Sequence, residues 1–418
     1  MHLQSILRRV YPHAGFVYGK VHERGVGEGR SLVVEVRPRK GARAFCSGCG
    51  KRRTPYDTLP PRRFTFVPLW AIPVSLEYAM RRVSCRGCGV TVEWVPWADG
   101  KSHVTHAFAW FIASWAKALS WAECARRFRT SWDTVFVCVA MAVRWGLAHR
   151  DLENIGAIGV DELAWKKGHK YLTLVYQLDR GRSRLLHIAQ NRTAASFHAF
   201  FDMLGEARTA AISFVASDMW AAFRSVIKAR CPNAAHILDR FHVMQMLSKA
   251  VDLVRREEVR GLRAKGKAPV LTKTRWLLLR NRDNLKRSEK GRLRELLDAN
   301  LRTVRAYLLK EEFRDFWGYI SSTWAEKFLD RWTTTAIRSR LEPFKRFAKT
   351  LRKHRDELLN WFAARRQFSA GATEGFNNKA RITTRKAYGF RTYEHARIAL
   401  FHALGALPEP PWLTHRFA

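Results

Sequence analysis

The sequence feature that most constrains the fold is a short, nearly continuous apolar run at residues 154–165, NIGAIGVDELAW. Apolar runs of this length, bounded by turn or helix signals, are typical of a strand that is buried on both faces. Asp161 lies near the end of the run. An ionised aspartate is unstable in such a strand unless it is paired, hydrogen-bonded or metal-bound. Either Asp161 lies at the exposed mouth of the strand, or other parts of the chain supply it with partners.

The segments after residue 155 predict an α/β domain at residues 151–243. Three consecutive strands in meander order are followed by a helix in TAASFHAFFDMLG, a strand that ends at Asp218, a second helix and the strand AAHILDRFHV. Asp218 ends an apolar run as Asp161 does, so two carboxylates occupy matching positions. Glu162 is next to Asp161 and should point to the opposite face of the strand, which favours a structural role.

Two Cys-x-x-Cys pairs, each followed by glycine, predict a metal site in residues 41–100. Two intervening residues let one tight turn present both thiolates to a tetrahedral ion, and glycine tolerates the dihedral angles of that turn. A hairpin is expected between the pairs. No thioredoxin-like strand and helix surround either pair, which argues against a redox site. We expect one structural zinc with no open position for a substrate, held by Cys46, Cys49, Cys85 and Cys88.

Residues 101–150 change to a helical period and predict a helix, a short turn at 129–131 and a second helix. Ser131 is a suitable N-cap for the second helix, and Asp133 suits the dipole of its first turn. This outline is typical of a helix-turn-helix, although antiparallel helix pairs are also common core elements. Residues 1–40 contain one expected strand, at 31–36, and receive no independent function.

Residues 244–367 are expected to be almost entirely helical and are very basic. In the final segment, 368–418, Thr373 can cap a helix that Glu374 begins, with Asn377 and Asn378 one turn further on. Recurrent tryptophans in the helical region are expected to pack between helices rather than to stack on bases: Trp276, Trp317, Trp324, Trp332 and Trp361. Three further cysteines are expected to be small core residues: Cys124, Cys138 and Cys231.

The charge balance points to a polyanionic partner. The chain has 75 Lys and Arg against 36 Asp and Glu, a formal net charge of +39. This charge is spread along the whole length rather than clustered in one tail, which favours nucleic acid over a membrane surface. No signal-peptide core is present at the N-terminus, and no uncharged apolar run approaches the ~18 residues that span a membrane. We therefore expect a cytoplasmic protein with no membrane contact.

These motifs, in this order, closely resemble bacterial insertion-sequence transposases of the ISL-three family. The resemblance covers most of the chain and is carried by the cysteine pairs, the helix-turn-helix outline, GVDE, SFVASDMW, ILDRFHV, ATEGFNNKAR and YGFR. It implies a multidomain DDE transposase, associated with the nucleoid. Its α/β ribonuclease-H-like core would comprise residues 151–243 and 368–418. An all-helical insertion at 244–367 would interrupt that core, and a zinc ribbon and helix-turn-helix would precede it.

By matching position, the resemblance assigns the catalytic carboxylates to Asp161, Asp218 and Glu374. They would hold two Mg²⁺ or Mn²⁺ ions, which activate the nucleophile and stabilise the leaving group in phosphoryl displacement. Without metal, three crowded carboxylates repel one another, so the site should be poorly formed or partly protonated until metal binds. Asp239 and His242 match an Asp-x-x-His signature that accompanies helical insertions in related transposases. A hydrogen-bonded core histidine is an equally good interpretation of His242.

The expected activity is binding to the terminal inverted repeats of the element, metal-dependent strand cleavage and strand transfer to target DNA. Two ends must be held together, so a dimer or larger synaptic assembly on double-stranded DNA is expected. Two alternatives stay open: a transposase-derived DNA-binding regulator without catalysis, and a ribonuclease-H-like nuclease or resolvase. Four residues that follow the glutamate are candidate phosphate contacts, with a solvated basic face as the alternative: Asn378, Lys379, Arg381 and Arg385.

Overall fold

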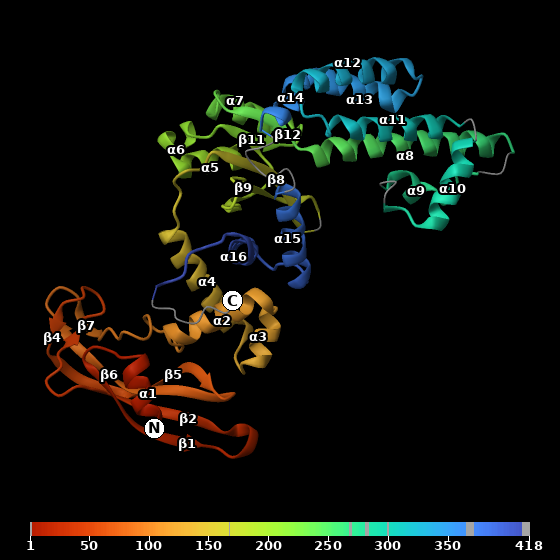
Figure 1. Ribbon diagram of the computed structural model, residues 1–418. Helices are drawn as coiled ribbons and strands as arrows, with labels where there is room; N and C mark the ends of the chain where they lie inside the picture. Colours follow the sequence, from red (N-terminus) through yellow and green to blue (C-terminus); the bar gives the residue numbers. More distant parts are fainter. Residues whose placement is uncertain are drawn as a thin grey trace. The chain divides into compact units, whose positions relative to one another are not determined.

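The computed structural model describes residues 2–166, 168–266, 270–280, 284–298, 301–364 and 372–411, with the backbone alone at 28, 363 and 372–374. The chain is a mixed α/β protein that forms two compact units (Figure 1). The first is built from Met1–Arg150 and two short C-terminal pieces, and the second mainly from Asp151–Leu400. In the part of the chain that is described, no helix combines the length and apolarity needed to cross a membrane.

A five-stranded sheet forms most of the N-terminal half of the first unit. Its path is β1-β2-β6-β5, and β7 pairs with β6. The strand expected at 31–36 is confirmed as β2, and it runs parallel to β6. Residues 1–40, which the sequence analysis set apart, therefore share one sheet with the cysteine-bearing region. The elements are α1 (Leu3–Val10), β1 (Phe16–Arg24), η1 (Gly27–Gly29), β2 (Ser31–Pro38), β3 (Ala44–Phe45), β4 (Arg52–Arg53), β5 (Pro55–Leu69), β6 (Ile72–Cys85) and β7 (Gly89–Val92).

The hairpin expected between the cysteine pairs is confirmed as the long β5–β6 pair. The two turn residues, Trp70 and Ala71, have positive φ angles of 51° and 64°. A two-residue turn with such angles matches the twist of the antiparallel strands that it joins. Near the end of β6, the Glu93 carboxylate is fully buried. It forms an ion pair with the guanidinium of Arg81 and accepts a hydrogen bond from the Tyr78 hydroxyl at 2.6 Å. A buried carboxylate with this many donors is satisfied in the folded protein.

Three helices follow the sheet: α2 (His106–Ala118), α3 (Trp121–Arg127) and α4 (Trp132–His149). The turn expected at 129–131 is confirmed between α3 and α4, where Arg129 has a φ of 49°. Ser131 is the N-cap of α4 as predicted, because its hydroxyl oxygen accepts a hydrogen bond from the Thr134 amide at 3.0 Å. Asp133 lies in the first turn. The local cap signals therefore set both helix boundaries.

The sheet of the second unit has the strand order β10-β9-β8-β11-β12. The strands β8, β9 and β10 are antiparallel, whereas β11 runs parallel to both β8 and β12. The predicted β-β-β-α-β-α-β order is confirmed, with one additional short helix, α6. The elements are β8 (Ala157–Lys166), β9 (Lys170–Gln177), β10 (Arg184–Gln190), α5 (Ala194–Leu204), α6 (Glu206–Ala210), β11 (Phe214–Ser217), α7 (Ala221–Arg230) and β12 (Ala235–Leu238).

The two faces of β8 have different coverings. Ile158 and Val160 belong to an apolar core that includes side chains of α5 and α7, such as Phe197 and Phe223. The helix α15 (Ala372–Lys386) packs on β8 as well (Figure 1). Side chains alternate between the two faces of a strand. Glu162 therefore lies on the same face of β8 as Ile158 and Val160, and Asp161 lies on the opposite face.

The region predicted to be helical is almost entirely helical in its described part, with short turns between the helices, and α8 and α11 lie side by side in it (Figure 1). The helices are α8 (Arg240–Ala264), α9 (Arg275–Leu279), α10 (Arg287–Asp298), α11 (Arg302–Phe316), α12 (Ser322–Arg338), α13 (Glu342–Lys353) and α14 (Arg355–Ala364); α16 (Tyr393–Leu404) follows α15. The three further cysteines are buried as expected.

The expectation for the tryptophans is correct for three and wrong for two. Trp317, Trp332 and Trp361 are buried and pack between helices. Trp276 and Trp324 are 60% and 61% exposed. Each lies on an outward helix face with one cation over its ring, Arg275 and Lys327 respectively, 4.9 Å from the ring centroid. A neighbouring cation can cover an aromatic face without an interhelical contact.

Candidate active site

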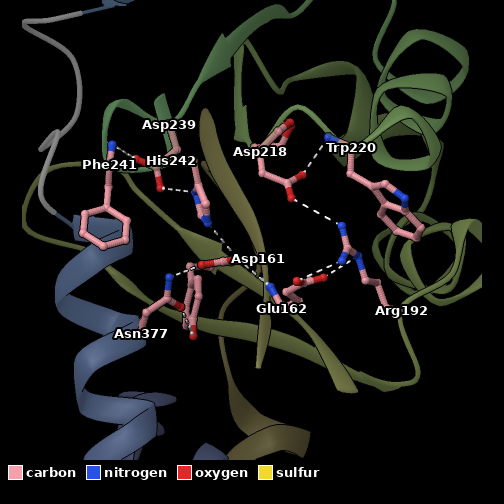
Figure 2. Close-up of polar contacts among 11 residues, drawn as sticks. Asp161, Glu162, Arg192, Asp218, Trp220, Asp239, Phe241, His242 and Asn377 are labelled. Carbon is pink, nitrogen blue, oxygen red and sulfur yellow. Dashed lines mark hydrogen bonds and ion pairs between the residues drawn. The ribbon is translucent and has the colours of Figure 1, made fainter. Parts of the chain in front are cut away.

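Asp161 is buried near the middle of β8, and other parts of the chain supply its partners (Figure 2). Only 6% of its side chain is exposed. The Asn377 amide donates a hydrogen bond to Oδ2, and the Glu162 backbone amide donates to Oδ1 at 2.7 Å. His242 Nε2 lies 4.0 Å from Oδ1. Burial raises the pKa of Asp161, and the charge of His242 opposes that shift. Asp161 therefore does not lie at an exposed strand mouth.

Asn377, on α15, joins Asp161 of β8 to Tyr176 of β9. Its carboxamide oxygen accepts a hydrogen bond from the Tyr176 hydroxyl at 3.3 Å, and Tyr176 is fully buried. The ring of Phe376 stacks on that of Tyr176, with centroids 4.9 Å apart. The sequence predicts that Asn377 lies on this helix but does not indicate its role. Both ends of its amide are used, so the residue fixes Asp161 to the helix.

Asp239 and His242 lie at the start of α8, and their three-residue spacing lets their side chains contact each other. His242 also faces Asp161. Asp239 caps α8, accepting from the Phe241 amide at 2.8 Å, and its second oxygen lies 3.2 Å from His242 Nδ1. Burial alone would lower the pKa of His242, but the hydrogen bond with Asp239 and the charges of Asp161 and Asp218 raise it to about 8. The carboxylates around His242 therefore favour its protonated form.

Asp218 follows β11 and is brought level with Asp161 by the sheet register, which pairs Ala216 with Gly159 in parallel. The Trp220 amide donates to its Oδ1 at 3.0 Å, and Arg192 Nη2 lies 3.6 Å from its Oδ2. Its side chain is 17% exposed. The carboxylates of Asp161 and Asp218 thus come from adjacent strands but are held by different partners.

Glu162 and Arg192 form an ion pair beside Asp218. Arg192 Nη1 lies 3.0 Å from Glu162 Oε1, and Nε contacts Oε2. Burial raises the pKa of Glu162, and the charge of Arg192 opposes that shift. Figure 2 shows the Glu162 side chain directed away from that of Asp161 and toward Arg192. The sequence does not indicate a role for Arg192, because only the fold brings it to Glu162.

Glu374 belongs to α15, but its side chain lies outside the described residues, as does that of Thr373. Among the described side chains, the cysteine cluster is the group of metal-type ligands whose atoms gather closely enough to hold an ion. The candidate phosphate contacts on α15 are all exposed: Asn378, Lys379, Arg381 and Arg385.

The four cysteines predicted to hold zinc form a cluster in the first unit. The four sulfur atoms all lie within 4.8 Å of one another, and such close spacing is needed for a tetrahedral four-thiolate site. Gly50 and Gly89 follow the pairs with φ of 66° and 72°, so the expected special turns are confirmed. The Arg53 guanidinium donates to Cys85 Sγ at 3.4 Å and lowers the pKa of that thiol to about 6. The cluster is compatible with a structural zinc.

Comparison with known proteins identifies relatives over most of the chain. A family model described as transposase, of the ISL-three DDE type, matches residues 158–400, more than half of the chain. The transposase for insertion sequence element IS1001 of Bordetella parapertussis is 31% identical over 370 residues, covering 88% of this chain and 90% of that protein. The transposase for IS1557 of Mycobacterium tuberculosis is 32% identical over 407 residues, covering 90% and 89% respectively.

Proposed function

This chain belongs to the ISL-three family of transposases, and on that premise we propose that it binds the terminal inverted repeats of its own insertion sequence, cleaves DNA there and transfers the ends to target DNA. One observation carries this proposal: the buried carboxylate of Asp161 lies level with Asp218 across a parallel strand pair, and the helix that contains Glu374 packs on the same strand. A costly buried carboxylate with acidic neighbours is typical of a metal-dependent phosphoryl-transfer site.

The strand order supports a ribonuclease-H-like core for residues 151–243 and 368–418. Three antiparallel strands in meander order are followed by two parallel strands on the other side of β8. In such a sheet, Asp161 and Asp218 come from adjacent parallel strands. The described helices between 244 and 364 would be the insertion that separates the two parts of the core.

The donor set suits hard cations. Asp161, Asp218 and Glu374 offer carboxylate oxygens, which Mg²⁺ and Mn²⁺ prefer. When bound, two such ions would supply activation of the attacking water or 3′-hydroxyl and stabilisation of the leaving oxygen. Asn377 and the Glu162 amide hold both Asp161 oxygens in a fixed orientation.

Two roles are open to His242 in this scheme. Its imidazole is held at Nδ1 by Asp239, so Nε2 faces the Asp161 side of the site. From there it can orient a scissile phosphate or pass a proton to a leaving oxygen. Both roles need the protonated form, which the carboxylates around it favour.

End recognition would fall to the first unit. The cysteine cluster would hold a zinc ion that stabilises the ribbon, and α3 with α4 would form a helix-turn-helix whose second helix enters the major groove. The exposed basic face of α15 would contact phosphates near the cut. Two ends must be paired for transfer, so the active form would be a dimer or larger assembly on DNA.

Alanine substitution tests the assignment directly. Asp161→Ala, Asp218→Ala or Glu374→Ala should each abolish Mg²⁺-dependent cleavage of end DNA and leave binding to that DNA intact. Asp202→Ala is the matched control, because Asp202 is an exposed acid of the same unit that pairs with Arg230. Cleavage that persists in any of the three variants contradicts the assignment.

Product analysis separates this function from the alternatives. With a target plasmid present, a transposase yields joined product, whereas a nuclease or resolvase cuts without joining. End-DNA binding by the wild-type protein with no cleavage in Mg²⁺ or Mn²⁺ would instead select a DNA-binding regulator.

A further inference from the structure

We propose that Arg192 is a positioning residue of the active site, which orients the carboxylate of Asp218 and uses Glu162 as its own anchor. The inference rests on the proposed function, because that function places Asp218 in the catalytic machinery. It also gives the Glu of the GVDE motif a role that differs from metal binding.

The backbone around Arg192 is held firmly. Arg192 lies between β10 and α5, immediately before the N-cap Thr193, whose hydroxyl oxygen accepts from the Ser196 amide at 3.1 Å. On its other side, Asn191 has a φ of 71°, and its carbonyl accepts a hydrogen bond from the Thr173 hydroxyl at 2.8 Å. A side chain that starts from a fixed backbone loses less entropy when it is ordered. The arginine is therefore directed at the site by the fold.

The guanidinium of Arg192 has three partners. It contacts both Glu162 oxygens, its Nη2 lies 3.6 Å from Asp218 Oδ2, and its centre lies 4.3 Å from the centroid of the Trp220 ring (Figure 2). A planar guanidinium that hydrogen-bonds one carboxylate oxygen through Nη1, pairs with the other through Nε and lies over an aromatic ring has little freedom to rotate. One nitrogen, Nη2, is left to face Asp218.

Trp220 closes the arrangement on Asp218. Its backbone amide donates to Asp218 Oδ1, and its ring covers the guanidinium that faces Asp218 Oδ2. Both oxygens of Asp218 are thus oriented by residues that also contact each other. Glu162 is the anchor that makes this possible, because it accepts a hydrogen bond from Nη1 and forms the closest ion-pair contact of the guanidinium.

A direct phosphate contact by Arg192 is the competing role. The Arg192 side chain is 29% exposed, with an edge on Glu162 and a face on Trp220. A phosphate would have to displace Glu162 or Asp218 to gain a bidentate contact. A role through Asp218 is therefore better supported by the contacts than a role in DNA affinity.

The experiment compares Arg192→Gln, Glu162→Gln and the double variant in single-turnover cleavage of end DNA at saturating protein. Each single variant should lower the cleavage rate about 10- to 100-fold, the usual loss when a group that orients a ligand side chain is removed. The Kd for end DNA should stay within about twofold. Because both residues act through one contact, the double variant should be no slower than the slower single variant. Arg192→Lys, which keeps the charge but cannot contact Glu162 and Asp218 through separate nitrogens of one planar group, should restore part of the rate.

Arg208→Gln is the matched control. Arg208 forms an ion pair with Glu153 at 2.7 Å in the same unit, and both of those side chains are well exposed. This variant should cleave at the wild-type rate. Thermal melting of each variant reports folding, and Arg192→Lys supplies the measurement if Arg192→Gln does not fold.

Three results would overturn the inference. Weaker DNA binding by Arg192→Gln, with a smaller salt dependence and an unchanged rate at saturation, would show a phosphate contact. A wild-type rate in Glu162→Gln would remove the anchor, and additive losses in the double variant would show independent roles. Failure of the proposed function gives a different result, because Asp218→Ala would then still cleave. If Asp218→Ala is inactive but Arg192→Gln is fully active, only the inference drawn from Arg192 is contradicted.

Discussion

Asn377 offers a graded test of how the buried carboxylate is held. Asn377→Ala removes the amide that donates to Asp161 Oδ2 and accepts from the Tyr176 hydroxyl. A hydrogen bond to a charged group contributes about 1.5–3 kcal/mol. Because about 1.36 kcal/mol corresponds to a tenfold change in rate, single-turnover cleavage should fall about 10- to 150-fold.

Tyr176→Phe should have a smaller effect, because it removes only the neutral hydrogen bond that anchors the amide. Such a bond contributes about 0.5–1.5 kcal/mol, so the rate should fall about 2- to 13-fold. Asn233→Ala, at an exposed asparagine of the same unit, is the control and should leave the rate unchanged.

The pH profile of Asn377→Ala should also move. Burial raises the pKa of Asp161, and the hydrogen bond from Asn377 lowers it. Loss of that bond raises the pKa further, and cleavage needs the ionised carboxylate, so the acid limb of the rate profile should shift to higher pH. A wild-type rate and profile in Asn377→Ala, or a larger loss in Tyr176→Phe than in Asn377→Ala, would refute this account.

Three further predictions concern stability. Cys85→Ser should remove the metal, so elemental analysis should fall from about one zinc per chain to none, and the first unit should melt at a lower temperature. Glu93→Gln leaves the Arg81 guanidinium, only 10% exposed, without its carboxylate, and should lower the free energy of unfolding of that unit by about 3–5 kcal/mol in denaturant titrations. Burial lowers the pKa of His236 from 6.5 to about 4. The unfolded chain therefore takes up the proton first, and the free energy of unfolding of the second unit should fall by up to about 3 kcal/mol as pH drops from 6.5 to 4, less so in His236→Gln.

Local signals were sufficient for much of the fold. The order of elements in the second unit, the cap at Ser131, the β5–β6 hairpin and the glycine turns beside the cysteines all follow from residues within a few positions of one another. The pairing of β2 with β6 does not, because it joins residues about forty positions apart and no local pattern encodes that register. Trp276 and Trp324 were misjudged for a related reason, since helical spacing does not say which helix faces remain uncovered.

The candidate site shows the same division. The positions of Asp161 and Asp218 at the ends of apolar runs were visible in the sequence, but the groups that orient them were not. Asn377 lies 216 residues from Asp161, and Arg192 lies 30 residues from Glu162. Asparagine and arginine are common on helices and in loops, so their types carry no signal until the fold brings them to a carboxylate.

The adjacent pair Asp161 and Glu162 explains why these distant partners are needed. Consecutive residues of a strand point to opposite faces. The Asp161 carboxylate of β8 therefore points toward α15, and the Glu162 carboxylate points toward the start of α5. Each face must supply its own polar partner, because an unpaired buried carboxylate is unstable. The Arg192 side is complete within residues 151–243, whereas the Asn377 side requires the chain to return after the long helical region. Packing of α15 on β8 thus brings the segment containing Glu374 to the sheet and also supplies the amide partner of Asp161, which couples assembly of the proposed metal site to the docking of this helix.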